Sequence, residues 1–139
     1  MTIIRALFAG LVLAFSTFTA QAQPLPPPLI KYHGQVPEPG FIYVYFGAAN
    51  WSAYSPVFFT PAPQLPPCGN NPGSSRAWIQ IYNAQTNGYI YGFCSLTAPV
   101  QFERIWFATP PSQKPKFVYV IIRDRLTKRA AKSNVMAVP

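Results

Sequence analysis

Apolar and polar residues are arranged along much of the chain in a way that predicts short β-strands separated by turns. Aromatic and β-branched residues fill residues 41–46, which lie between Pro39-Gly40 and Gly47, and this composition is typical of a strand. Residues 77–82 alternate with a period of two, so one face would carry the even-numbered side chains. Both segments are therefore expected to be strands of a sheet.

The second half of the chain predicts further strands joined by recognisable turns. Asn87-Gly88 precedes an aromatic segment at 89–94 and predicts a hairpin, because both residues tolerate positive φ. Residues 101–107 form another expected strand. Residues 117–122 are apolar without alternation, so we expect this strand to be buried on both faces at the centre of a sheet.

Four other segments carry weaker signals. Residues 51–59 are rich in aromatic side chains and predict one more short strand, whereas 64–75 is a loop rich in Pro and Gly. The basic stretch 123–132 is expected to be a turn between antiparallel strands, with a short helix over 125–132 as the alternative. Residues 134–138 would form the last strand.

This succession of elements predicts an all-β fold. About seven strands with turn signals every 8–15 residues, and no helical pattern longer than two turns, are typical of an antiparallel sandwich. A small barrel of the oligonucleotide-binding (OB) type is the alternative.

The N-terminal segment predicts export. Arg5, the apolar run 6–18 and the small-residue site Ala20-Gln21-Ala22 are the three parts of a Sec-type signal peptide over residues 1–22. The run is shorter than the roughly 20 residues that span a bilayer, so we expect no transmembrane anchor after cleavage. Residues 23–35 would then be a Pro-rich N-terminal arm, and residues 36–139 one β-sandwich domain.

Composition narrows the compartment and the partners. Half of the residues are apolar and 16% are aromatic, which indicates a folded chain rather than a disordered one. The net charge of +8 falls to +7 when Arg5 leaves with the signal peptide. Seven of the basic residues lie between Lys114 and Lys132, beside one acid, Asp124, and such a field attracts polyanions.

Two cysteines, Cys68 and Cys94, follow the signal peptide. In an oxidising compartment they predict one disulfide, which would tie down the loop that carries Cys68. Zinc is the rival interpretation, but the chain holds a single His and no CxxC spacing. We therefore expect a disulfide, no metal site and no cofactor.

From Arg76 to Val138 the order of features resembles the second half of an immunoglobulin-like or fibronectin type III-like domain. The features are the segments 78–82 and 117–120, followed by a polar hairpin that ends in Ser133-Asn134-Val135. Cys68 and Cys94 lie too close to Trp78 for the bridge that joins the two sheets in antibody domains. The resemblance therefore implies a fold of about seven strands in a bacterial secreted protein, and no catalytic residues.

Catalytic groups are scarce. After the signal peptide the acids are Glu38, Glu103 and Asp124, and none of them is placed as half of the carboxylate pair that glycoside hydrolysis needs. A Ser or Cys nucleophile needs a positioned base, and the only histidine, His33, lies in the expected arm. We therefore expect that the protein is not an enzyme.

Two sets of residues are candidates for binding. Five cations of the basic hairpin are candidate contacts for phosphates or acidic sugars: Arg123, Arg125, Lys128, Arg129 and Lys132. Four aromatic residues are candidate contacts for a sugar or a protein partner: Trp51, Tyr54, Tyr89 and Tyr91.

These observations favour a non-catalytic interaction domain, periplasmic or secreted, that binds a protein or an anionic glycan of the cell envelope. Nucleic acid is a less favoured partner. Two other functions stay open: an inhibitor that plugs a hydrolase with the loop Pro66 to Gly73, and a structural subunit of an envelope assembly that pairs through an edge strand.

Overall fold

The computed structural model describes residues 25–68 and 74–139, and over these ranges the chain forms eight β-strands and four 3-10 helices. The strands are β1 (Ile30–Glu38), β2 (Phe41–Ala48), β3 (Ala77–Asn83), β4 (Tyr89–Phe93), β5 (Ile105–Thr109), β6 (Phe117–Asp124), β7 (Ala130–Lys132) and β8 (Met136–Ala137). The 3-10 helices are η1 (Trp51–Ala53), η2 (Pro56–Phe59), η3 (Pro99–Glu103) and η4 (Pro111–Gln113). The expected signal peptide at 1–22 lies outside the described residues.

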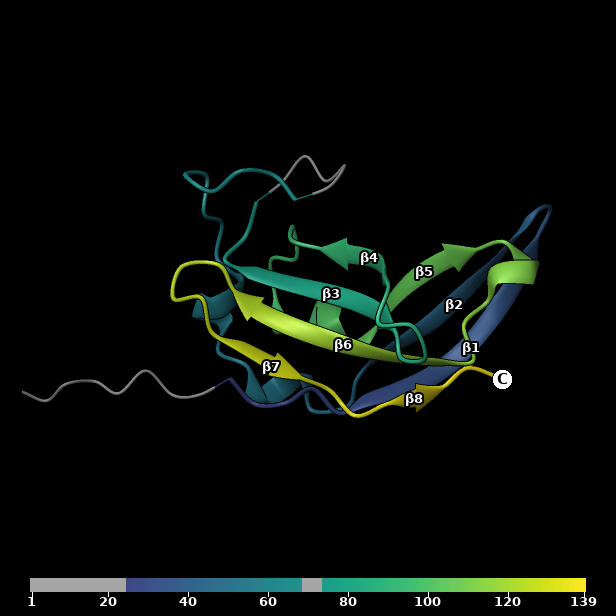
Figure 1. The fold of residues 1–139 in the computed structure, drawn as a ribbon. Coiled ribbons are helices and arrows are strands. Elements are labelled where there is room, and N and C mark those ends of the chain that lie inside the picture. The colour runs from purple at the N-terminus through teal and green to yellow at the C-terminus, as the bar shows by residue number, and fades with distance from the viewer. Residues whose placement is uncertain (1–24, 69–73) are drawn as a thin grey trace, which may run out of the picture.

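The strands form two antiparallel sheets that lie in two layers (Figure 1). One has the order β1-β2-β5 and the other the order β4-β3-β6-β7, with β8 also paired to β6. In Figure 1, β3, β6 and β7 lie in front of β1 and β2. This confirms the expected antiparallel β-sandwich. Across the described ranges the sheets do not close into a barrel, so the OB alternative is wrong.

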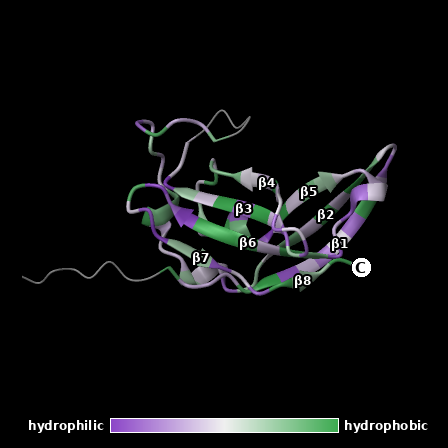
Figure 2. Cartoon of the chain, in the orientation of Figure 1, coloured by the Kyte–Doolittle hydropathy of each residue, from purple (hydrophilic) through white to green (hydrophobic). Residues whose placement is uncertain are grey.

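The core lies between the two sheets. Every second side chain of a strand points inward, and the fully buried ones come from both layers. They include Val44, Phe46, Ile79, Ile81, Phe107, Val118, Val120 and Ile122. In Figure 2 hydrophobic segments run along β3 and β6, the two strands at the centre of the larger sheet. Burial of each large apolar side chain stabilises the fold by about 1.5–3 kcal/mol.

The β3–β6 pair is the part of the fold that the sequence predicted best. Ile79 lies opposite Ile122 and Ile81 opposite Val120, with the same alternation on both strands. β6 pairs with β3 on one side and with β7 and β8 on the other, so its central position is confirmed. Its outer face is only partly covered, since Phe117 stays 41% exposed.

The predicted strand at 51–59 is wrong, because these residues form η1 and η2. Pro56 begins η2, and the Ser55 hydroxyl accepts a hydrogen bond from the Val57 amide. Proline suits the start of a helical turn because its fixed φ and missing N–H cost nothing there. The turn directs Phe58 and Phe59 into the core beside Tyr54, so the apolar content of this segment reflects burial without a strand.

The strand expected at 101–107 is wrong in its first half, where the chain forms η3. The Gln101 side-chain oxygen accepts hydrogen bonds from the amides of Thr97 and Ala98, at 2.6 and 3.2 Å. These bonds hold a turn that a strand would not allow, and β5 begins only at Ile105.

The expected N-terminal arm does not stand apart from the domain. Its residues from Ile30 onward form β1, which pairs with β2 along its whole length. Before β1, Pro28 is fully buried and the Tyr54 hydroxyl donates to the Pro26 carbonyl at 2.5 Å. The side-chain amide of Asn50 donates a hydrogen bond from Nδ2 to the Pro27 carbonyl at 3.1 Å. Prolines lack an amide donor but keep the carbonyl acceptor, and these acceptors fix the segment to the domain.

The expected disulfide between Cys68 and Cys94 is confirmed. Its Cα atoms are 6.1 Å apart, an ordinary separation for such a bond. Cys94 directly follows β4, so the bond joins the Pro-rich loop to the edge of the larger sheet. A disulfide indicates an environment outside the reducing cytoplasm. Within the described residues, no helix has the length and apolar character needed to cross a bilayer.

Removing the disulfide should destabilise the protein. The two cysteines are 26 residues apart, and closing a loop of this size contributes about 3 kcal/mol, chiefly by restricting the unfolded chain. We expect the Cys68→Ser/Cys94→Ser variant to lose about that much free energy of unfolding in urea titrations. An unchanged midpoint would contradict a stabilising role.

Gly47 should be intolerant of any side chain. A Cβ built there would lie 1.8 Å from the Glu103 carbonyl oxygen, because the backbone of η3 crosses β2 at this residue. We expect Gly47→Ala to cost about 3 kcal/mol or more in thermal or urea unfolding, since backbone must move. Gly88→Ala is the matched control, because its Cβ would meet only the Thr86 hydroxyl at 3.2 Å. Equal losses in both variants would refute this account of Gly47.

Candidate functional site

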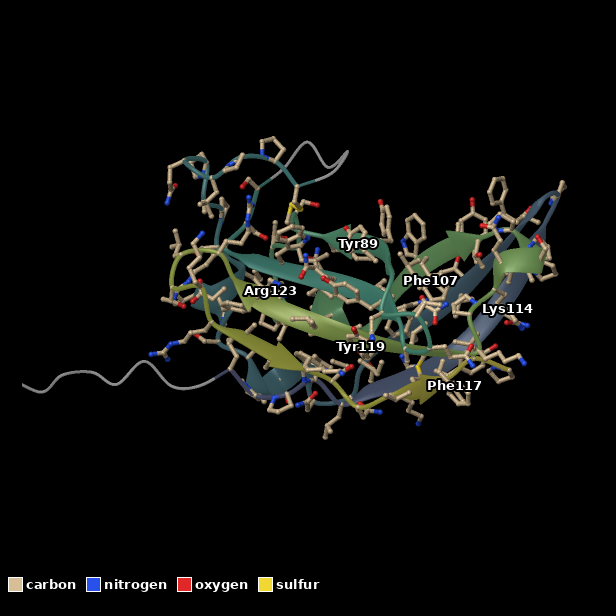
Figure 3. The ribbon with its side chains drawn as sticks, viewed as in Figure 1. Tyr89, Phe107, Lys114, Phe117, Tyr119 and Arg123 are labelled. Atoms are coloured by element: carbon tan, nitrogen blue, oxygen red, sulfur yellow. A yellow bond between two sulfur atoms is a disulfide. The ribbon has the colours of Figure 1, made fainter. Side chains whose placement is uncertain are left out.

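The outer face of the larger sheet carries rings and cations. Since Ala77, Ile79 and Ile81 of β3 fill the core, the alternate side chains Trp78, Gln80 and Tyr82 point outward. The register places them opposite Arg123, Ile121 and Tyr119 of β6, respectively. Tyr119 and Arg123 lie along the face turned to the viewer in Figure 3. We call this surface, with Tyr89 and Lys132 at its margins, the aromatic–cationic face.

Three tyrosines pack against one another on this face. The rings of Tyr82 and Tyr119 are stacked, with centroids 5.3 Å apart and planes 11° apart. The Tyr89 ring meets Tyr82 edge-on at 5.8 Å and stays 53% exposed. The Lys132 ammonium lies 4.1 Å from the centroid of the Tyr119 ring, within the range of a cation–π contact. Tyr119 itself is only 6% exposed, so this cluster meets solvent through Tyr82, Tyr89 and Lys132.

Gly92 allows Trp78 and Tyr89 to come together. A Cβ on Gly92 would lie 2.5 Å from the Tyr89 hydroxyl and 2.9 Å from Trp78 Nε1, so only glycine leaves room for both. Among the described residues, Trp78 Nε1 has no hydrogen-bond partner of ordinary geometry. Although Tyr89 is half-exposed, the partial burial of its side chain is the largest cause that raises its pKa; Tyr82 and Tyr91 raise it further, while the nearby Trp78 indole lowers it.

Two arginines extend this face in different ways. Arg123 Nε donates to the Gln80 side-chain oxygen at 2.5 Å, and the Tyr82 hydroxyl donates to the same oxygen at 3.2 Å. This network holds the Arg123 guanidinium along the sheet. Arg125 instead donates to the Ser74 hydroxyl at 3.0 Å and to the Pro66 carbonyl, so it fastens the cysteine loop to the basic hairpin.

Asp124 organises the turn between β6 and β7. Its carboxylate accepts bonds from the amides of Leu126 and Thr127, from the Thr127 hydroxyl and from both Nε and Nη2 of Arg76. The turn also places Lys128 at a φ of 64°, and the Lys128 amide donates to the Asp124 carbonyl at 2.8 Å. The expected turn between two antiparallel strands is thereby confirmed, and the alternative helix is wrong.

The same bonds change the ionisation of Asp124. Burial alone would raise the pKa of this carboxyl group, which is 4% exposed. The hydrogen bonds from Arg76, from the Thr127 hydroxyl and from the two backbone amides outweigh burial and hold its pKa well below the usual range. Asp124 is therefore ionised and neutralised by Arg76, which leaves the surrounding cations without a competing free carboxylate.

A pocket opens where the basic hairpin meets the cysteine loop, and we call it the cationic pocket. Its volume is about 290 Å³. It is lined by Leu65, Pro66, Trp78, Arg123, Asp124, Arg125 and Lys128. The pocket thus adjoins the Trp78 end of the aromatic–cationic face, and its charged groups are three cations and the neutralised Asp124.

Four of the five cations expected to bind anions lie together. Arg123, Arg125 and Lys128 line the cationic pocket, and Lys132 lies on the adjacent sheet face. Arg129 instead lines a separate cavity of about 330 Å³ beside the Arg76–Asp124 ion pair and the N-terminal segment. The structure therefore does not place Arg129 with the other four.

The expected aromatic contacts are scattered. Tyr89 lies on the aromatic–cationic face, and Trp51 is half-buried against the core. Tyr91 stacks on Trp106 of β5, with centroids 5.5 Å apart. Tyr54 is only 3% exposed, and burial raises its pKa well above the usual range. Tyr54 is thus a core residue, and its prediction as a surface contact is wrong.

Sequence reasoning missed the rings that make up most of this face: Trp78, Tyr82 and Tyr119. The alternation in β3 already placed the first two on one side, but only the β3–β6 register brings Tyr119 next to Tyr82. A second aromatic group was also missed. Trp106 contacts Tyr91 and Phe93 across the gap between β5 and β4, so these rings cover the edge where the two sheets meet.

The residues considered for catalysis do not form a metal-binding cluster. Within residues 25–68 and 74–139, no group of three or more His, Cys, Asp or Glu side chains could hold a metal ion. His33 lies on β1, with its Nε2 2.9 Å from the Glu103 carbonyl oxygen, so it belongs to a strand rather than to an arm. The loop considered as an inhibitor's plug includes residues 69–73, which lie outside the described residues.

Comparisons with known protein families, with curated proteins and with solved structures found no match for this chain.

The dependence of the free energy of unfolding on acidic pH tests the role of Asp124. Because its pKa is lower in the folded state than the unfolded value of about 3.9, its contribution is present above about pH 4 and is lost as pH falls below that value. We expect Asp124→Asn to lose roughly 2–4 kcal/mol at pH 7 and to lose less stability than the wild type between pH 5 and pH 2. If the stability of the wild type and of Asp124→Asn fell equally with pH, the ionised, paired state of Asp124 would be contradicted.

Proposed function

We propose that this chain is an exported, non-catalytic binding domain whose aromatic–cationic face binds an anionic glycan of the cell envelope. The observation that carries the proposal is the union of the stacked tyrosines with Arg123 and Lys132 on one sheet face. Among the described residues, the one carboxylate next to these cations, Asp124, is buried and paired with Arg76. These cations would therefore attract an anion, because no free carboxylate of the described residues beside them competes for them.

The dimensions of the face favour a chain of sugars over a single small ion. Successive outward residues of a strand are about 6.6 Å apart, so Tyr119 and Arg123 are about 13 Å apart along β6. Trp78 and Tyr82 span the same length on β3. The rings of this face that reach solvent, Trp78, Tyr82 and Tyr89, offer an apolar surface with polar edges, which suits saccharide units. The cations at either end suit their acidic groups.

Fold and compartment agree with this proposal. The order β1-β2-β5 matches the A-B-E part of the A-B-E-D sheet of immunoglobulin-like sandwiches, and β4-β3-β6-β7 matches their C′-C-F-G sheet, so we infer that this sandwich is immunoglobulin-like. The disulfide supports a periplasmic or secreted location, as does the expected signal peptide. Nucleic acid would satisfy the same cations, but an exported domain meets acidic glycans first.

Binding to polyanions at two salt concentrations tests the proposal. The full chain would be expressed with its leader and purified from the periplasm of a bacterial host. The probes are a polyuronate, single-stranded DNA and neutral dextran. We expect the polyuronate to bind more tightly than the DNA, dextran not to bind, and the affinity for the polyuronate to fall about tenfold or more between 50 and 300 mM NaCl.

Matched charge variants locate the contact. Lys132→Gln removes a cation from the aromatic–cationic face, whereas Lys31→Gln removes an exposed cation from β1 in the other sheet. We expect Lys132→Gln to weaken polyuronate binding several-fold and Lys31→Gln to have little effect. Equal effects, salt-insensitive binding, tighter binding of DNA, or no polyanion binding at 50 mM salt would each refute the proposal.

A further inference from the structure

The cationic pocket has the size of a site for one ring-sized group. Its volume of about 290 Å³ lies at the lower limit of pockets that hold small molecules, about 300–1,000 Å³. An oligosaccharide would exceed it, and a bare ion would leave most of it empty. The pocket therefore differs in kind from the open sheet face beside it.

Two cations of this pocket are available to a ligand. Within the described residues, the Lys128 ammonium has no hydrogen-bond or ion-pair partner, and the Arg123 guanidinium uses Nε alone, for Gln80. Arg125 is engaged with Pro66 and Ser74, and its guanidinium lies over the Trp78 ring, 5.8 Å from the centroid, so it builds part of the wall of the pocket. Asp124 accepts both hydrogen bonds of Arg76 and does not neutralise Lys128 or Arg123. The pocket therefore presents an uncompensated positive charge.

The remaining walls are apolar and are held in place before any ligand arrives. The Trp78 indole lines the pocket together with Leu65 and Pro66. The Cys68–Cys94 disulfide ties this loop to the end of β4, and the Ser75 amide donates to the Cys94 carbonyl at 2.6 Å. A site fixed in this way loses little entropy when it binds.

We propose that the cationic pocket binds a single anionic sugar unit, with its carboxylate or phosphate at Arg123 and Lys128 and its ring against Trp78. This inference rests on the proposed function, because the pocket would hold one acidic unit of the glycan that lies along the sheet face. A flat apolar wall beside two cations suits a ligand with one apolar face and one charged edge. Neither a neutral sugar nor a small inorganic ion has both properties.

Titration with five small probes tests this assignment. Glucuronate carries a carboxylate on a sugar ring, and glucose 6-phosphate carries a phosphate. Glucose supplies the sugar ring without a charge, while acetate and inorganic phosphate supply the anion without a ring. We expect at least one of the two acidic sugars to bind at least tenfold more tightly than glucose and than its own free anion. The stronger of the two identifies the charged group. Inorganic phosphate or acetate binding as tightly as the acidic sugars would overturn the proposal.

The three tryptophans provide an internal control for the location. The chain contains Trp51, Trp78 and Trp106, and their indole N–H signals can be followed separately by NMR. We expect the acidic sugar to shift the Trp78 signal while the other two stay in place. Shifts confined to Trp51 or Trp106 would place the ligand elsewhere and contradict the assignment.

Variants separate the pocket from the face as a whole. Arg123→Gln and Lys128→Gln should each weaken binding of the acidic sugar at least fivefold without changing the melting temperature by more than a few degrees. Lys132→Gln, on the face but outside the pocket lining, should weaken the polyuronate and leave the acidic sugar unchanged. Equal losses in all three variants, or polyuronate binding without acidic-sugar binding, would refute the pocket while the proposed function stood. If the wild-type protein bound neither the polyuronate nor the acidic sugar, both the pocket and the proposed function would be refuted.

Discussion

The antiparallel pairing of β3 with β6 is the constraint on which the rest of the structure depends. Its register aligns two alternating strands so that the apolar side chains of Ile79, Ile81, Val118, Val120 and Ile122 fill the core and the intervening side chains share the outer face. A slip of one residue would bury Arg123 and expose Ile122. The same pairing that stabilises the sandwich therefore assembles Trp78, Tyr82 and Tyr119 beside their cations, so stability and the candidate binding surface have one cause.

The basic turn and the Pro-rich loop form the rest of the candidate site. Asp124 ends β6 and gathers the donors that shape the basic turn. Arg125 and the Cys68–Cys94 disulfide then hold the Pro-rich loop against that turn. Because Arg76 already neutralises Asp124, the turn keeps a well-defined shape without losing its positive charge. Rigid walls and exposed cations coexist here, which is the condition for a preorganised anion site.

The sequence predicted the strands whose alternation or apolar content is strong, and it failed where burial comes without strand geometry. Residues 51–59 look like a strand because aromatic residues are common in strands, but Pro56 starts a 3-10 turn that reaches the core by another route. Tyr54 looked like a contact residue for the same reason. Site prediction was limited differently: the cations were recognisable as a cluster, but their neighbours across the sheet, such as Tyr119 beside Tyr82, depend on register. No local pattern specifies the partner strand.

We propose above all that the outer face of the β3–β6 pair is the binding surface. Its most direct test is a map of backbone amide shifts in the full chain as a uronate oligosaccharide is added. We expect perturbations at residues 78–82, 119–123 and 128–132, with the β1-β2-β5 sheet unaffected. Perturbations confined to β1, β2 and β5 would contradict it.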